Sequence, residues 1–558
     1  MANRVRWACS EGLDDDCAAL LQRYATRDAY GCLRFLRAAP GATPRLGTMR
    51  ALLVASVLTT TAFQAPPHPI RRRTRRRSVG TALDDVTTEA TKVFVPYEGK
   101  VPAYVRGTYY RNGPGAWTTK AQNLTHLFDG FALLCSFAFR DGGVELTSKF
   151  LASEARAFAV EHDRLLFNEF GTAAGVSPAD RVASLVRSSL RGGTTDNAVV
   201  NVLPRPDGTL LAISEPTSAT FRVDGDTLAT LGRDRYDGGD SVGLLHTAHP
   251  LPRLGKLVNV ATSLAPPRYE VYVADDGLRN PRRVASLPSA RAFDVSWHHA
   301  FAATATKAVV VETPAVYNVG ALMGAVGADH VAFDWKPEGG TWVTVVDIES
   351  GAVVARRRCE RDFFFFHCAN AFEEDGSVRV DLCAYDDARI VDGLSLAAMR
   401  RDPAVGGVEV GRLARLDVAL DGDAPATLEF LDDAAATGEF SEFPVVNPAV
   451  AGARHRYVYA VGAARPTNVA NVLTKTDCDA RTTNTLAWPG VAVVGEPLFV
   501  PDPAGAREDD GALLVVLHDV SGDAHVAVVD ARTFAEVARA TMPRGAVPYG
   551  FHGAWRAA

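Results

Sequence analysis

Four histidines of this chain stand in apolar, strand-like segments far apart in the sequence. They are His249, His299, His367 and His552, separated by gaps of 50, 68 and 185 residues. No single helix or hairpin spans such gaps, so the imidazoles can meet only on the axis of a radially repeated fold. An all-nitrogen site with open coordination positions is typical of an oxygen-activating iron enzyme rather than of structural zinc. The spacing alone leaves zinc, copper and iron open.

Three glutamates stand close to proline within apolar sequence: Glu215 in AISEPT, Glu442 in SEFPVVNP and Glu496 in GEPLFVP. An unpaired carboxylate in such surroundings is unfavourable. A carboxylate that accepts the outer N–H of an imidazole fixes the tautomer of a metal ligand and makes it more basic. The residues themselves leave two interpretations open: acceptors for buried histidines, or solvated carboxylates at sheet edges.

Short valine-rich runs must position these side chains. From about residue 90 such runs alternate with Gly, Pro and Asp, a pattern typical of an all-β body with many strands. A propeller closes such sheets radially and leaves only short edges. No repeat period is visible, so the pattern alone indicates a large β protein. The predicted strands include residues 208–215, 256–263, 307–314, 341–347, 377–385, 455–462, 512–520 and 525–534.

Two segments carry helical patterns instead. Residues 177–193 place an apolar stripe opposite arginines, between Pro178 and two glycines. This helix would either lie in a membrane interface or pack on the protein body with solvated arginines. A second predicted helix, residues 393–403, would be an insertion between strands.

Composition narrows the class of protein. The chain has 558 residues, of which 47% are hydrophobic and 22% charged, and its net charge of −6 gives no general attraction to nucleic acid. The eight cysteines form no CxxC pair and no dense framework, which fits a reducing compartment.

The first 83 residues differ from the rest. A short apolar run after Met49 has the shape of a signal-peptide core, and residues 71–77 read RRRTRRR. Together they resemble the bipartite targeting sequence of algae with complex plastids, and we expect Met49 to be the true start. The alternative is a disordered basic tail. Residues 84–558 are then the folded domain.

Nine sequence segments, in order, resemble the carotenoid cleavage oxygenase family. The likeness favours the animal-type branch, which holds the β-carotene oxygenases and the retinoid isomerohydrolase. Each segment alone is weak evidence for the family, but together they cover the chain from about residue 90 to 558. They are GTYYRNGPG (107–115), HLFDGFALL (126–134), TDNAVVNV (195–202), HTAHP (246–250), VVVETP (309–314), FHCANAFEEDG (366–376), SEFPVVNP (441–448), EPLFVPDPAGAREDDG (496–511) and PYGFHG (548–553).

The resemblance implies a seven-bladed β-propeller with a helical and loop cap over an axial Fe(II). It implies that the four histidines named above bind the metal and that the three glutamates partner three of them. Neighbouring His246 and His298 are then not ligands, and His126 resembles a family position without being one.

The resemblance also implies a reaction: an Fe(2+)- and O2-dependent dioxygenase that splits a conjugated double bond of a carotenoid or apocarotenoid into two carbonyl products. Residues 363–366, four phenylalanines, would line the substrate tunnel or pack in the core. One alternative keeps the iron site but isomerises or hydrolyses a retinoid. Another is a propeller that binds carotenoid without turnover. The expected location is the plastid, with membrane contact through residues 177–193, and the cytoplasm is the alternative.

Overall fold

The computed structural model describes residues 79, 81–175, 177, 179–181, 183, 184, 186, 194–318 and 333–558. The predicted targeting segment lies outside the described residues except at its end. There, Val79, Ala82 and Leu83 are buried in the main core. Packing against the domain therefore extends a few residues upstream of residue 84.

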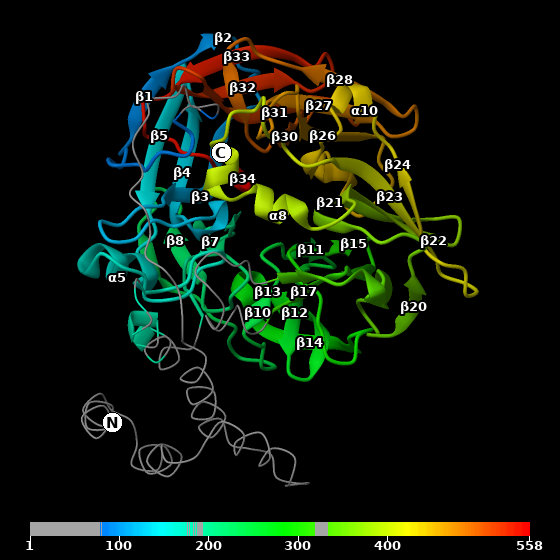
Figure 1. Cartoon of the computed structure of the whole chain (residues 1–558). Helices are drawn as coiled ribbons and strands as arrows, with labels where there is room; N and C mark the ends of the chain where they lie inside the picture. The colour runs from blue at the N-terminus through cyan, green and yellow to red at the C-terminus, as the bar shows by residue number, and fades with distance from the viewer. Residues whose placement is uncertain are drawn as a thin grey trace, which may run out of the picture.

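Within the described residues, seven sheets of four to six strands form the blades of a propeller, as predicted (Figure 1). Blade 1 holds β1 (Val93–Pro96), β5 (Gly143–Phe150), β4 (Phe131–Arg140), β3 (Gly107–Ala116) and β34 (Gly553–Ala557). Blade 2 holds β6 (Asn201–Pro204), β7 (Thr209–Ile213), β8 (Thr220–Asp224) and β9 (Thr230–Arg233). Blade 3 holds β10 (Leu245–His246), β11 (Leu251–Arg253), β12 (Lys256–Leu264), β13 (Pro267–Asp275) and β14 (Arg279–Pro288).

The remaining blades continue around the ring. Blade 4 holds β15 (Ala302–Ala303), β16 (Lys307–Glu312), β19 (Trp342–Asp347) and β20 (Val353–Arg358), with the pair β17 (Ala315–Tyr317) and β18 (Phe333–Trp335) as a separate ribbon. Blade 5 holds β21 (Phe364–Glu374), β22 (Ser377–Tyr385), β23 (Gly411–Ala419) and β24 (Thr427–Phe430). Blade 6 holds β25 (Glu442–Val445), β26 (Tyr457–Gly462), β27 (Val472–Asp477) and β28 (Thr482–Leu486). Blade 7 holds β29 (Val491–Val494), β30 (Leu498–Pro501), β31 (Gly511–Asp519), β32 (Ala524–Asp530), β33 (Ala535–Thr541) and β2 (Glu98–Gly99).

Two strand pairings close the ring. The last strand, β34, pairs with β3 of the first blade, placing Gly553 opposite Arg111. In the other direction the early strand β2 pairs with β33 of the last blade, placing Glu98 opposite Arg539. Each end of the chain therefore completes the sheet begun by the other, which removes free sheet edges at the junction.

The predicted strands are confirmed, with shifts at their ends. The prediction for residues 377–385 coincides with β22, whereas that for 525–534 ran too far. The strand β32 ends at Asp530 because the Asp530 carboxylate accepts hydrogen bonds from the backbone N–H groups of Arg532 and Thr533 and forms a turn.

In the part of the chain that the structure describes, helices are few and short. Those with defined bounds are α5 (Glu154–His162), α8 (Arg389–Gly393), α9 (Leu396–Met399) and α10 (Ala434–Thr437), with 3-10 turns η1 (Leu127–Asp129), η2 (Asp276–Leu278), η3 (Pro337–Gly339) and η4 (Pro448–Val450). The helical insertion expected at 393–403 is present, but its bounds were wrong. Ser395 caps a short helix, α9, by accepting from the N–H of Ala398, so α9 is separate from α8 and ends at Met399. Most of the expected helix at 177–193 lies outside the described residues, and 179–181, 183, 184 and 186 are helical.

The helices α8 and α9 lie between β22 and β23 and cross the centre of the ring (Figure 1). Three hydrogen bonds fasten them to the segment around η1: His126 Nε2 to Val391 O at 2.8 Å, the N–H of Leu127 to Leu394 O at 3.0 Å, and the N–H of Leu396 to Thr125 O at 2.8 Å. They form the cap predicted over the axis. In the part of the chain that the structure describes, no helix combines the length and apolarity needed to span a membrane.

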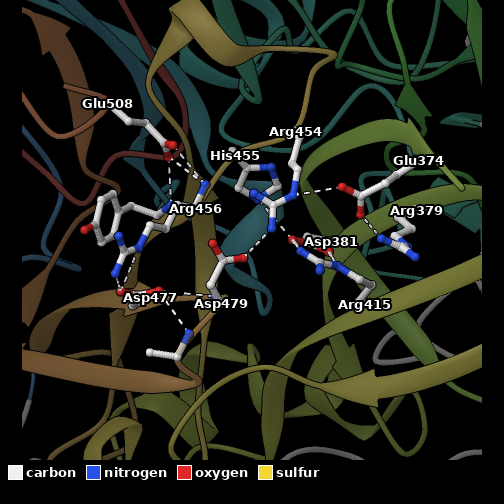
Figure 2. Close-up of polar contacts among 12 residues, drawn as sticks. Glu374, Arg379, Asp381, Arg415, Arg454, His455, Arg456, Asp477, Asp479 and Glu508 are labelled. Atoms are coloured by element: carbon white, nitrogen blue, oxygen red, sulfur yellow. Dashed lines mark hydrogen bonds and ion pairs between the residues drawn. The ribbon is translucent and has the colours of Figure 1, made fainter. Parts of the chain in front are cut away.

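A network of buried charges joins blade 5 to blade 6 (Figure 2). Arg415 donates from Nε and Nη2 to the two carboxylate oxygens of Asp381, at 2.7 and 2.8 Å, and His455 Nε2 lies 3.0 Å from the same carboxylate. The Cys478 sulfur lies within 4.8 Å of a carboxylate oxygen of Asp381 and of a ring nitrogen of His455. Because Arg415 already engages both oxygens, and because burial raises the pKa of the Cys478 thiol, we interpret this cluster as an ion-pair network rather than a metal site.

Replacing Asp381 by asparagine is expected to lower the free energy of unfolding by about 3–5 kcal/mol, because it leaves a buried guanidinium without its counter-charge. Denaturant titration monitored by tryptophan fluorescence measures the loss. The matched control is Asp479→Asn, since this more exposed carboxylate pairs with Arg454 at the surface and is expected to contribute at most about 1 kcal/mol. Equal losses in both variants would contradict the assignment.

Candidate metal centre

The four predicted histidines lie on axis-side edges of four different blades. His249 lies between β10 and β11, His299 just before β15, His367 within β21, and His552 directly before β34. Their sheets begin or end at these strands, so the side chains project toward the axis. The structure thus brings together residues that local spacing could not connect.

The imidazoles meet through their Nε2 atoms. Nε2 of His299 lies 3.2 Å from that of His249 and 3.2 Å from that of His367, and Nε2 of His367 lies 3.1 Å from that of His552. The four candidate donor atoms all lie within 4.8 Å of one another. These residues form the histidine cluster.

Each predicted glutamate contacts one histidine of the cluster on the side away from the centre. The Nδ1–carboxylate distances are 2.7 Å for His299–Glu215, 2.5 Å for His367–Glu442 and 2.7 Å for His552–Glu496. A carboxylate accepts only, so it holds the proton on Nδ1 and leaves the Nε2 lone pair facing the centre.

The cluster is suited to a cation. Burial, reinforced by the neighbouring imidazoles, holds the pKa of His249 and of His552 well below the usual value for histidine. Neutral rings whose lone pairs converge within hydrogen-bond distance repel one another unless a positive charge lies between them. The donor set, four imidazoles, fits a divalent transition metal such as iron, copper or zinc.

The carboxylates are themselves held in place. Glu442 also accepts from Tyr385 Oη at 3.0 Å and from the N–H of Phe443 at 2.8 Å. Glu496 accepts from the N–H of Gly553 at 2.9 Å, and burial raises the pKa of Glu496 to about 7 despite the opposing influence of Arg111. These bonds fix the orientation of the histidine partners.

The three histidines predicted from the sequence to be non-ligands, His246, His298 and His126, lie outside the cluster. His246 contacts Tyr236 Oη at 2.6 Å and Ser214 O at 2.9 Å, and the ring of His298 packs on Tyr269. His126 binds the cap through Val391. None of these three joins the grouped donor atoms found among the described residues.

A large apolar cavity opens beside the cluster, with about 1710 Å³ of empty space that includes its opening to solvent. His299, His367 and His552 line it. Phe128 also lines it, with its ring 6.4 Å from that of His299 and 5.4 Å from that of Phe551. Other aromatic lining residues are Phe170, Trp297, Tyr317, Phe333, Phe366, Tyr385, Phe440, Phe443 and Tyr549.

The phenylalanine run divides as strand alternation requires. Phe366 lines the cavity, while Phe363 and Phe365 pack in a separate core between blades 4 and 5. Phe364 packs against Phe366 in the central core. The run therefore serves both of the expected roles.

Sequence reasoning missed Glu169, a carboxyl group on the cavity wall. Its Oε1 accepts from Thr195 Oγ1 at 2.8 Å. Burial, together with the negative charges of Asp129 and Asp196, raises the pKa of Glu169 well above its usual value. No spacing or motif signals it, and only its neighbours Phe167 and Phe170 hint at an apolar setting.

Comparison with known proteins gives consistent matches along the chain. The family model described as retinal pigment epithelial membrane protein matches residues 83–557. The chloroplastic carotenoid cleavage dioxygenase 8 of Arabidopsis thaliana is 31% identical over 509 residues, covering 88% of this chain and 89% of that protein. The β,β-carotene 15,15'-dioxygenase of Homo sapiens is 30% identical over 496 residues, covering 80% and 88%. The crystal structure of cobalt-substituted Synechocystis apocarotenoid oxygenase shares the fold, with a TM-score of 0.72 at 23% identity, covering 87% and 99%.

Proposed function

Because the chain belongs to the carotenoid cleavage oxygenase family, we propose that it is an iron(II)-dependent dioxygenase of carotenoids or apocarotenoids. The proposed reaction splits one conjugated double bond with O2 and leaves two carbonyl products. The observation that carries the proposal is the histidine cluster at the wall of a large apolar cavity, where a polyene can lie beside a metal.

The Nε2 atoms of His249, His299, His367 and His552 would hold the metal. Four neutral donors leave the charge of a dication intact, and when bound, iron(II) supplies the site at which dioxygen is bound and reduced. The cobalt-substituted relative supports a divalent transition metal in this fold.

The chain's own residues supply geometry and a dry environment. The aromatic walls formed by Phe128, Phe366 and Phe551 exclude water and can stack on a flat conjugated chain, so that its position along the cavity decides which double bond lies beside the cluster. Glu169 lies on the same wall, where burial raises its pKa and so favours the neutral carboxyl group beside an apolar substrate.

Oxygen dependence separates the proposed reaction from its alternatives. Iron-loaded protein incubated anaerobically with β-carotene or a β-apocarotenal is expected to give no new aldehydes, and admitting air is expected to restore them. Liquid chromatography with mass spectrometry identifies the products, and 18O2 labels the new carbonyl oxygens. Equal product without oxygen would point to isomerisation or ester cleavage of a retinoid. A protein that retains the carotenoid unchanged in air and binds no iron would be a binding propeller.

We further propose a plastid location. The matched plant relative is described as chloroplastic, and residues 1–83 carry the predicted targeting pattern. The complex plastid of an alga, and membrane contact through residues 177–193, belong to the same proposal. A fluorescent protein fused behind residues 49–83 that stays in the cytoplasm would overturn the plastid location.

A further inference from the structure

Arg111 of β3 is a deeply buried cation near the histidine cluster, 3% exposed. Among the ion pairs between described residues, none includes its guanidinium, and its Nε has no hydrogen-bond partner. A buried charge without a direct counter-ion is unfavourable unless the surroundings use it. The mechanism described so far gives Arg111 no role.

The guanidinium holds the two backbone segments that carry the His552–Glu496 pair. Nη1 donates to the main-chain oxygen of Glu496 at 3.0 Å, and Nη2 donates to the main-chain oxygen of Phe551 at 2.7 Å. Nη1 also donates to Tyr109 Oη at 2.8 Å, which gives the guanidinium a third anchor. One side chain thus ties the segment before the last histidine to the segment of its carboxylate partner.

Glycine makes the room that this clamp needs. A Cβ at Gly550 would lie 2.6 Å from Arg111 Nε, and one at Gly495 would lie 3.4 Å from its Nη atoms. Both glycines stand next to the clamped residues, so the guanidinium and the two segments pack as one unit. A side chain at position 550 would displace the guanidinium, whereas a Cβ at position 495 would be in ordinary contact with it.

Arg111 also balances the charge of the groups around the histidine cluster. When all three glutamates are deprotonated, a dication at the histidine cluster would offset two of their three negative charges. Arg111, which interacts electrostatically with Glu496, supplies the remaining positive charge in the same buried region. This argument rests on the proposed function, because it assumes a bound dication.

We propose that Arg111 is a positioning residue for the metal centre: it clamps Glu496 and His552 so that the imidazole points its Nε2 at the metal, and it balances the charge of the carboxylates. Without the clamp the imidazole of His552 is held less firmly. Loss of a group that orients a metal ligand typically lowers metal affinity by about 10- to 100-fold.

The test measures cobalt(II) affinity by visible absorption with a competing chelator, alongside thermal unfolding. Arg111→Met is expected to weaken cobalt binding by at least about 10-fold and to shift the cobalt spectrum, and Arg111→Lys to recover part of the affinity through its charge. The matched control is Arg205→Met, since Arg205 is a buried arginine of blade 2 that pairs with Asp234. It is expected to lose stability without losing cobalt affinity.

A milder variant keeps the test informative if Arg111→Met does not fold. Tyr109→Phe keeps Arg111 but removes one anchor of the clamp, and it is expected to shift the cobalt spectrum in the same direction with a smaller loss of affinity. The inference is overturned if Arg111→Met and Tyr109→Phe bind cobalt like the wild type, or if Arg205→Met loses as much affinity. Wild-type protein that binds no cobalt would overturn the proposed function together with this inference.

Discussion

Substituting His367 by alanine is expected to abolish iron loading and product formation, with a loss of activity of more than about 100-fold, beyond that typical of outer partners. The change removes the donor whose Nε2 lies 3.2 Å from that of His299 and 3.1 Å from that of His552. It also leaves the buried carboxylate of Glu442 without its imidazole partner. Iron per chain by plasma mass spectrometry, and aldehyde formation in air, measure the two effects.

The control for His367→Ala is His525→Ala. His525 is also buried, but it lies on β32 of blade 7 and contacts Thr541 Oγ1 at 3.0 Å and Asp519. This variant is expected to load iron like the wild type. If His367→Ala kept a full complement of iron and normal turnover, the histidine cluster would not be the metal site.

Replacing Glu442 by glutamine is expected to weaken metal affinity by about 10- to 100-fold while leaving the fold intact. The amide has nearly the same shape, but it is neutral and a weaker acceptor for His367 Nδ1–H. Its NH2 group also cannot accept from Tyr385 Oη or from the N–H of Phe443. Chelator competition with iron or cobalt measures the change.

Glu312→Gln is the matched control for this second variant. Glu312 is 1% exposed and accepts from Ser289 Oγ at 3.1 Å and from the N–H of Ala290 at 2.9 Å, within blade 4 and its preceding loop. Its loss is expected to leave metal affinity unchanged. Equal weakening by both substitutions would mean that general destabilisation, rather than the His367–Glu442 bond, lowers the affinity.

The strands could be predicted from local pattern, whereas their closure could not. Valine-rich runs bounded by turn residues mark β22 and β12 closely, because a strand's signal is contained in its own residues. The pairing of β34 with β3 depends on contacts between opposite ends of the chain, which no local pattern records. The resemblance to a known family supplied the number of blades.

The choice between neighbouring histidines shows the same limit. His246 and His249 differ by three positions in similar sequence, yet one ring binds Ser214 O and the other joins the cluster. Spacing cannot separate them, because the turn between β10 and β11 decides which ring faces the axis. The family motif pointed to His249.

Residues whose role comes from long-range packing were missed altogether. Arg111 stands in a motif that served only to recognise the family, and nothing in its neighbours shows that it will meet the carbonyl oxygens of Glu496 and Phe551. The raised pKa of Glu169 likewise comes from its burial and from the nearby charges of Asp129 and Asp196. By contrast, the split of the phenylalanine run could have been predicted from strand alternation alone.

The double closure of the ring sets an order of events during synthesis. Chains generally fold as they leave the ribosome, N-terminal parts first. Blade 1 begins that process but stays without its axis-side strand until β34 has been made, and His552 arrives with that strand. A nascent chain can therefore gather at most three of the four imidazoles. The proposed metal would therefore meet all four donors only after β34 has been made, and the blade that is synthesised first is among the last to be completed.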